Sequence, residues 1–137
     1  MGSRREGREM ALQVLYLSET CNMSLEDALT ATLSETGAES SVKKFASHLA
    51  AGVNENKPRI DELLVKYAQN WDLKRMAAVD RNILRLSTYE ILFDTDTPLS
   101  VIIDEAIEVA KTFSTDDSGK FVNGILDKIK SERASAS

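Results

Sequence analysis

Basic, aromatic and amide side chains occur together in the segment 116–129, close to the C-terminus. Lys120, Phe121 and Asn123 fall within one helical turn of each other. Such a set can contact single-stranded nucleic acid, because a cation binds phosphate, a ring stacks on a base and an amide bonds a base edge. Apolar residues at helical spacing and two glycines run through the same segment, so the alternative is a helix that packs closely on a neighbour. On these residues alone, the packing helix is the favoured interpretation.

A second candidate site lies at the N-terminus, where Arg4, Arg5 and Arg8 fall within the first two turns of an expected helix. Arg4 and Arg8 are four residues apart and therefore lie on one side of it. Their planar guanidinium groups can bind phosphate through paired hydrogen bonds. Glu6 and Glu9 are interleaved with them, so an ordinary solvated helix face is the alternative. The residues alone leave both interpretations open.

Catalytic and metal-binding motifs are absent from the sequence. Its one cysteine, Cys21, and one histidine, His48, cannot build a zinc site of the usual kind. Glycine-rich phosphate loops and nucleophile motifs are missing as well. The sequence therefore predicts a binding protein without cofactor or metal, and not an enzyme.

The composition is that of a globular protein with net negative charge. Of its 137 residues, 42% are apolar and 28% are charged, and the formal net charge is −5. An acidic protein binds polyanions weakly unless a local basic patch or a basic partner assists. The N-terminus lacks a signal-peptide core, and no apolar run reaches the length of a membrane span. Together with the single cysteine, this predicts a cytoplasmic protein without membrane contact.

Helices must position these residues, because apolar residues recur at the helical period and strand-like alternation is scarce. The sequence predicts an all-α fold with about seven helices in two small packed helical bundles. We expect one domain over 1–137, with subdomains 1–70 and 71–131 and a frayed tail at 132–137. The first three helices are expected to begin near Ser3, Ser24 and Ser40. The second should end at Gly37, and the third should end, kink or restart at Pro58. Later helices are expected near 73–76, 79–90, 98–110 and 119–129.

Four segments carry a longer pattern: RREGREMALQVLY, VDRNILRLSTYEI, PLSVIIDEAIEVAK and DDSGKFVNGILDKI. In this order they resemble the NusB family of bacterial transcription antitermination factors. The resemblance extends over almost the whole chain, and KFVNG with its preceding helix is its most specific part. It implies an all-α fold of two helical subdomains.

The resemblance also implies a function. NusB proteins bind the box A element of nascent ribosomal RNA leader transcripts together with NusE, a small-subunit ribosomal protein, on the elongating RNA polymerase complex. Gly7 stands where alanine is more usual in the family, which predicts first turns that order only on binding. The matching positions imply RNA contacts at Arg4, Arg5, Arg8, Asp117, Ser118, Lys120, Phe121 and Asn123, and NusE contacts at Tyr16 and Asp80.

Other functions stay open from the sequence. A protein-binding helical adaptor or homodimer without RNA function fits the acidic charge and the short basic patch. An RNA-modifying enzyme would need a second polypeptide, although NusB-like domains precede some RNA methyltransferases. Single residues also have structural alternatives: Phe121 as core, Tyr16 as a half-buried helix residue, and Asn123 as a backbone cap. Salt-dependent RNA binding in the presence of NusE would separate the first two functions.

Overall fold

The computed structural model describes residues 2–69 and 71–136, and all regular structure in these residues is helical, which confirms the predicted all-α fold. None of the described helices is both long and apolar enough to cross a membrane. In chain order the elements are α1 (Gly2–Thr20), α2 (Leu25–Ser34), α3 (Ser40–Tyr67), the 3-10 helix η1 (Leu73–Arg75), α4 (Ala78–Phe93), α5 (Leu99–Phe113), α6 (Asp116–Ile129) and α7 (Ser131–Ala136).

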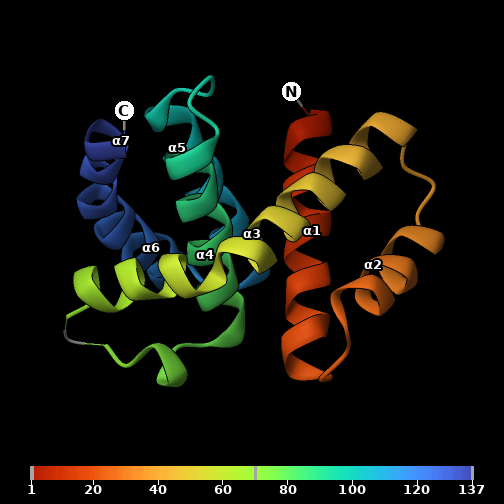
Figure 1. Ribbon diagram of the computed structural model, residues 1–137, viewed down its shortest axis with the longest axis horizontal. Helices are drawn as coiled ribbons and strands as arrows, with labels where there is room; N and C mark the ends of the chain where they lie inside the picture. The colour runs from red at the N-terminus through yellow and green to blue at the C-terminus, as the bar shows by residue number, and fades with distance from the viewer. Residues whose placement is uncertain (1, 70, 137) are drawn as a thin grey trace.

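The helices form two groups that α3 connects (Figure 1). Helices α1 and α2 lie beside the N-terminal half of α3, and α4 to α7 lie on the other side. The long helix α3 crosses the molecule and contacts α1, α4 and α6. A boundary near residue 70 stays a prediction, because α3 belongs to the first group by sequence but also packs on the second.

Helix α4 is the centre of the core. It contacts α1, α3, α5, α6 and α7, and it is buried from Asp80 to Leu92 on nearly all sides. A helix covered all round must place some polar side chains inside, and each of these needs a partner. Asn82, Arg85 and Glu90 are such residues.

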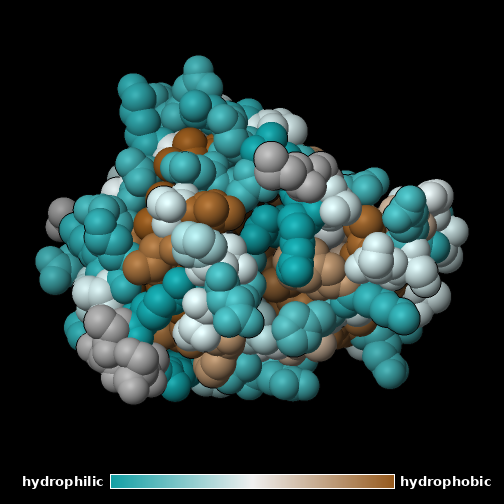
Figure 2. Space-filling model, turned by 90° about the horizontal axis from the view of Figure 1, so that it is seen from above, coloured by the Kyte–Doolittle hydropathy of each residue, from teal (hydrophilic) through white to brown (hydrophobic). Residues whose placement is uncertain are grey.

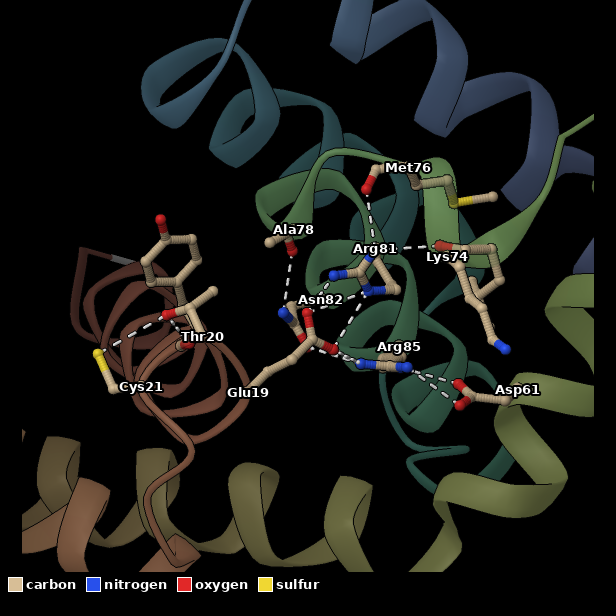
Figure 3. A network of polar contacts seen from close by, with 12 residues as sticks. Glu19, Thr20, Cys21, Asp61, Lys74, Met76, Ala78, Arg81, Asn82 and Arg85 are labelled. Carbon is tan, nitrogen blue, oxygen red and sulfur yellow. Dashed lines mark hydrogen bonds and ion pairs between the residues drawn. The ribbon is translucent and has the colours of Figure 1, made fainter.

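An ion network joins α4 to α1 and α3 (Figure 3). Arg85 donates to Asp61 of α3 (Nε–Oδ1 2.8 Å) and to Glu19 of α1 (Nη1–Oε2 2.5 Å). Arg81 also binds Glu19 (Nε–Oε1 3.1 Å). Burial raises the pKa of Glu19, but the hydrogen bonds from Arg81 and Arg85 outweigh it and lower the pKa to about 2. Glu19 is therefore a charged link between two helices.

Two of the expected helix starts are confirmed where a side chain caps the backbone. The Ser24 hydroxyl accepts from the Asp27 amide (3.1 Å) at the start of α2, and Asp72 accepts from the Lys74 amide (3.0 Å) at η1. Helix α3 begins at Ser40 as predicted and continues through Pro58 to Tyr67. Of the three outcomes expected at Pro58, the end of the helix is therefore excluded.

Other boundaries differ from the prediction by a few residues. Helix α1 already includes Gly2, so Ser3 lies inside the helix. Helix α2 ends at Ser34, ahead of Gly37. Pro98 occupies the cap position of α5, and the hydroxyl of the preceding Thr97 donates to Asp94 Oδ2 (2.8 Å).

The expected frayed tail is a helix as far as the structure describes it. Arg133 of α7 donates to the backbone carbonyls of Ile91 (2.9 Å), Asp94 (2.8 Å) and Thr97 (2.8 Å). These groups lie at and just beyond the end of α4, where carbonyls lack helical partners. One guanidinium group thus satisfies several of them and joins α7 to α4, while fraying of the tail at 132–137 stays a prediction. Residue 137 lies outside the described residues.

Candidate nucleic-acid interface

The KFVNG segment lies in the first half of α6, on a helix with one buried and one exposed face. Thr115 starts this helix by accepting from the Ser118 amide (3.1 Å), and Asp116 and Asp117 suit the positive end of the helix dipole. Lys120 and Asn123 point outward and are exposed. The helix therefore combines core packing with a polar surface. Nucleic-acid contact by that surface stays a prediction.

The two glycines of α6 have different surroundings. A Cβ atom at Gly119 would lie 3.4 Å from side-chain atoms of Ile107 and Lys111, so this glycine faces α5 closely. A Cβ atom at Gly124 would meet nothing within 4 Å. The contacts at Gly119 are ordinary van der Waals distances, so packing requires a glycine neither there nor at Gly124.

Lysines from two helices meet beside Gly119. Lys111 of α5 and Lys120 of α6 line one shallow hollow, here called the lysine hollow, together with Asn123. Ile107, Asp116 and Gly119 complete its lining. Sequence reasoning missed Lys111, because only the packing of α5 on α6 brings it next to Lys120.

A second hollow lies where the chain between α3 and α4 meets the start of α6. This tryptophan hollow is lined by Trp71, Arg75, Met76, Ala77, Asp80, Thr115, Asp117, Ser118 and Phe121. Phe121 is half-buried and packs edge to face against Trp71, with ring centroids 5.1 Å apart and planes at 72°. Sequence reasoning did not single out Trp71 as a site residue, and its status as the sole tryptophan was the one available signal.

Asp80 and Ser118 meet in the tryptophan hollow and are both mostly covered. The Ser118 hydroxyl donates to Asp80 Oδ2 (3.2 Å), and it also shares a hydrogen bond with the Ser114 hydroxyl (2.8 Å). Asp80 is 9% exposed. The structure therefore places the predicted NusE contact Asp80 beside the predicted RNA contacts Asp117, Ser118 and Phe121.

The N-terminal arginines have three different environments. Arg8 is 5% exposed and forms a two-pronged pair with the buried Glu90 (Nη2–Oε1 2.8 Å, Nε–Oε2 3.0 Å). Arg5 is paired with Glu105 of α5 (Nη2–Oε2 2.5 Å) but stays about half exposed. The guanidinium carbon of Arg4 lies 4.3 Å from the centre of the Phe45 ring. Arg4 and Arg5 thus form the outer surface of this patch, whereas Arg8 anchors it.

Gly7 allows the Phe45 ring to pack against α1 beneath the arginine patch. A Cβ atom at Gly7 would lie 2.5 Å from Phe45 Cδ2, so only glycine leaves room for this ring against α1. The ring in turn supports Arg4. The first turns were predicted to order only on binding; instead α1 is helical from Gly2 onward, with Gly7 buried.

Tyr16 lies in an exposed apolar groove. It is 40% exposed, and the tyrosine groove around it is formed by Leu12, Gln13, Tyr16, Leu17, Val79 and Phe113 from α1, α4 and α5. On the face that Figure 2 shows, hydrophobic surface occurs in patches between hydrophilic side chains. A groove with this lining suits a protein partner.

The sequence was compared with those of known protein families. The model of the NusB family matches residues 5–131. The chain belongs to the NusB family. NusB proteins are transcription antitermination factors and not enzymes, which confirms the prediction of a non-enzymatic function.

NusB proteins from several bacteria match between two thirds and nearly all of this chain. Transcription antitermination protein NusB of Geobacter sulfurreducens is 47% identical over 133 residues, which cover 96% of each chain. The protein of the same name from Elusimicrobium minutum is 44% identical over 140 residues, covering 97% of this chain and 96% of its own. That from Thermotoga sp. strain RQ2 is 55% identical over 92 residues, covering 67% of this chain and 65% of its own.

Solved NusB structures share the fold. T. maritima NusB superposes with a TM-score of 0.87 at 45% identity, covering 94% of this chain and 91% of that one. A crystal structure of the antitermination factors NusB and NusE in complex with dsRNA matches with a TM-score of 0.88 at 23% identity, covering 96% and 98% of the two chains. The second likeness supports the fold alone.

Proposed function

We propose that the protein binds the box A element of nascent ribosomal RNA leader transcripts together with NusE, and thereby acts on the elongating RNA polymerase complex. The observation that carries this proposal is the exposed polar face of α6, where Lys120 and Asn123 lie beside Phe121. Membership of the NusB family supports it, since a solved NusB structure is a complex with NusE and dsRNA.

RNA contacts are proposed for the exposed members of the predicted set. Lys120, with Lys111 beside it, supplies positive charge, and Asn123 supplies an amide. Phe121 supplies a ring for stacking. Arg4 and Arg5 are proposed as phosphate contacts of the second patch.

Three predicted RNA residues are proposed in modified roles. The guanidinium of Arg8 is engaged by Glu90, so we propose that Arg8 holds α1 in place for Arg4 and Arg5. The hydroxyl of Ser118 is engaged with Asp80, so Ser118 positions the start of α6. Asp117 is exposed at the rim of the tryptophan hollow and limits how much negative charge can approach it.

NusE is proposed to bind at the tyrosine groove. Tyr16 offers both apolar area and a hydroxyl, a combination typical of interface anchors. The net charge of −5 favours fast association with a basic ribosomal protein. Asp80 stays a prediction as a NusE contact, because only a group that enters the tryptophan hollow reaches its carboxylate.

The test is a gel-shift titration of the protein with a box A RNA, with and without purified NusE, at low and at physiological salt. We expect weak binding by the protein alone, tighter binding with NusE, and loss of affinity as salt rises. A scrambled RNA of equal length is the control. If the protein binds NusE or itself but no RNA at either salt concentration, the adaptor or homodimer function replaces this proposal.

A further inference from the structure

Trp71 is unusually placed for a large aromatic residue. It is the only tryptophan of the chain and is 59% exposed. Its backbone is nevertheless fixed, since its amide donates to the Ala68 carbonyl (2.9 Å). An exposed ring costs hydrophobic free energy, so a ring held in position at the surface offers area for a ligand.

The neighbouring side chains turn this ring into one wall of a site. Phe121 packs edge to face with it at an interplanar angle of 72°, and Trp71 keeps most of its surface exposed. Arg81 donates to the carbonyls of Leu73 (3.0 Å) and Met76 (2.8 Å), which fixes the turn that carries Arg75. Trp71, Arg75 and Phe121 all line the tryptophan hollow.

A buried carboxylate oxygen in this hollow lacks a partner. Asp80 Oδ2 accepts from Ser118, but Oδ1 is buried and has no hydrogen-bond partner among the described residues. A buried acceptor without a donor is costly, and such groups in native proteins call for an explanation. A ligand that brings an N–H donor into the tryptophan hollow would supply the missing hydrogen bond.

We propose that the tryptophan hollow binds one unstacked nucleobase that carries an exocyclic amino group. The base stacks on Trp71 or Phe121, its amino group donates to Asp80 Oδ1, and Arg75 contacts a neighbouring phosphate. This inference rests on the proposed RNA binding and names one base-recognition site within it.

The carboxylate gives this site a preference. Cytosine presents an amino donor at the position where uracil presents a carbonyl acceptor. The only Watson–Crick donor of uracil, its N3–H, is flanked by two carbonyl oxygens that a carboxylate repels. The two bases are otherwise alike in ring size, so cytosine and uracil form a matched pair of probes for Asp80.

The experiment follows the fluorescence of Trp71 during titration with oligocytidylate and with oligouridylate of equal length at low salt. We expect quenching by both and roughly tenfold tighter binding of oligocytidylate, the effect of one hydrogen bond to a charged group. Asp80→Asn should abolish the preference for cytosine while the quenching remains. Trp71→Ala, followed by anisotropy of labelled RNA, should weaken binding roughly 5- to 150-fold, as loss of one stacked base does.

Controls separate this inference from the proposed function. Phe93→Ala removes another exposed aromatic ring, and it should leave affinity unchanged. Melting temperatures of all variants report the fold. RNA binding without quenching of Trp71, or equal affinity for the two oligonucleotides, would overturn the inference but not the RNA function. Failure to bind any RNA, even with NusE, would overturn both.

The Asp80→Asn variant can also give a result that assigns this carboxylate to the protein partner. If Asp80→Asn leaves RNA binding unchanged but weakens the affinity for NusE, its free oxygen serves a cation of the protein partner, and the base site is refuted.

Discussion

Ion pairs with carboxylates determine which arginines of the N-terminal patch are free to bind RNA phosphates. Arg5 is held by Glu105, and hydrogen bonding from Arg5 lowers the pKa of that carboxyl group. Arg5 itself is about half exposed, so a phosphate can compete for it. Glu105 therefore competes with an RNA phosphate for the guanidinium group of Arg5.

Glu105→Gln should raise RNA affinity several-fold, because Arg5 no longer has a carboxylate partner. The dependence of affinity on salt should also steepen by about one phosphate contact. Filter binding across a salt series measures both quantities. Glu108→Gln is the matched control, since it removes an equal charge from the same helix without a hydrogen bond to Arg5; an equal gain there would reduce the effect to net charge.

Substitution by alanine should affect mainly the stability of the protein at Arg8 and mainly its RNA binding at Arg4. Arg8→Ala leaves Glu90 buried without its partner, so we expect a loss of ~3–5 kcal/mol in the free energy of unfolding. Arg4→Ala should leave stability nearly unchanged and reduce the salt dependence of RNA binding by about one contact. Urea unfolding and RNA titration of both variants check this. A stable Arg8→Ala protein with weakened RNA binding would restore Arg8 as a phosphate contact.

The sequence could place these arginines on a helix but not assign their partners. The spacing of Arg4 and Arg8 is local, so it predicts a common side of α1. The carboxylates of Glu90 and Glu105 come from α4 and α5, and only tertiary packing brings them to α1. The same limit explains why Trp71 and Lys111 were missed as candidate site residues.

At the scale of helices, the glycines of α1 and α6 divide into two kinds. Gly7 makes room for the Phe45 ring, whereas Gly124 faces open space. Glycine lowers helix stability relative to alanine at both positions. Only at Gly7 is there a packing reason for it.

Gly124→Ala should therefore stabilise the protein by ~0.5–1 kcal/mol, as helix propensity predicts. Gly7→Ala should destabilise it by about 1–3 kcal/mol, because the added methyl group displaces the Phe45 ring. Denaturant unfolding of both variants gives the comparison. A gain in stability from Gly7→Ala would show that the ring shifts at no cost.

Helix starts were predictable where one side chain caps its own backbone, as at Ser24 and Asp72. Helix ends were less so. Helix α2 ends at Ser34, ahead of Gly37, and α7 is joined to α4 by the contacts of Arg133. Boundaries set by distant partners cannot be read from local spacing.

At the scale of the molecule, the Glu19 network connects α1, α3 and α4 (Figure 3), and it makes stability depend on pH. The pKa of Glu19 is about 2 in the folded protein, below its ordinary value in an unfolded chain. The stabilisation is therefore present above the unfolded pKa and is lost as the pH falls toward the folded one.

We expect the free energy of unfolding to fall between about pH 5 and pH 2, with about 1–2 kcal/mol attributable to Glu19 after allowance for solvent screening. Urea titrations at several pH values, on the wild type and on Glu19→Gln, measure this contribution. The variant should be less stable at neutral pH and should lose less on acidification. Parallel pH curves for the two proteins would contradict this role of Glu19.

The contacts of Arg133 with the end of α4 can form only late in synthesis, after α4, α5 and α6 have been made. The carbonyls at the end of α4 receive their donor from a residue that the ribosome adds well after α4 itself. During translation the central helix therefore exists with an unsatisfied C-terminal end until α7 has emerged and docked. A nascent chain stalled before Arg133 already contains all the residues proposed to contact RNA and NusE, whereas the last turn of α4 still lacks the donor that Arg133 supplies.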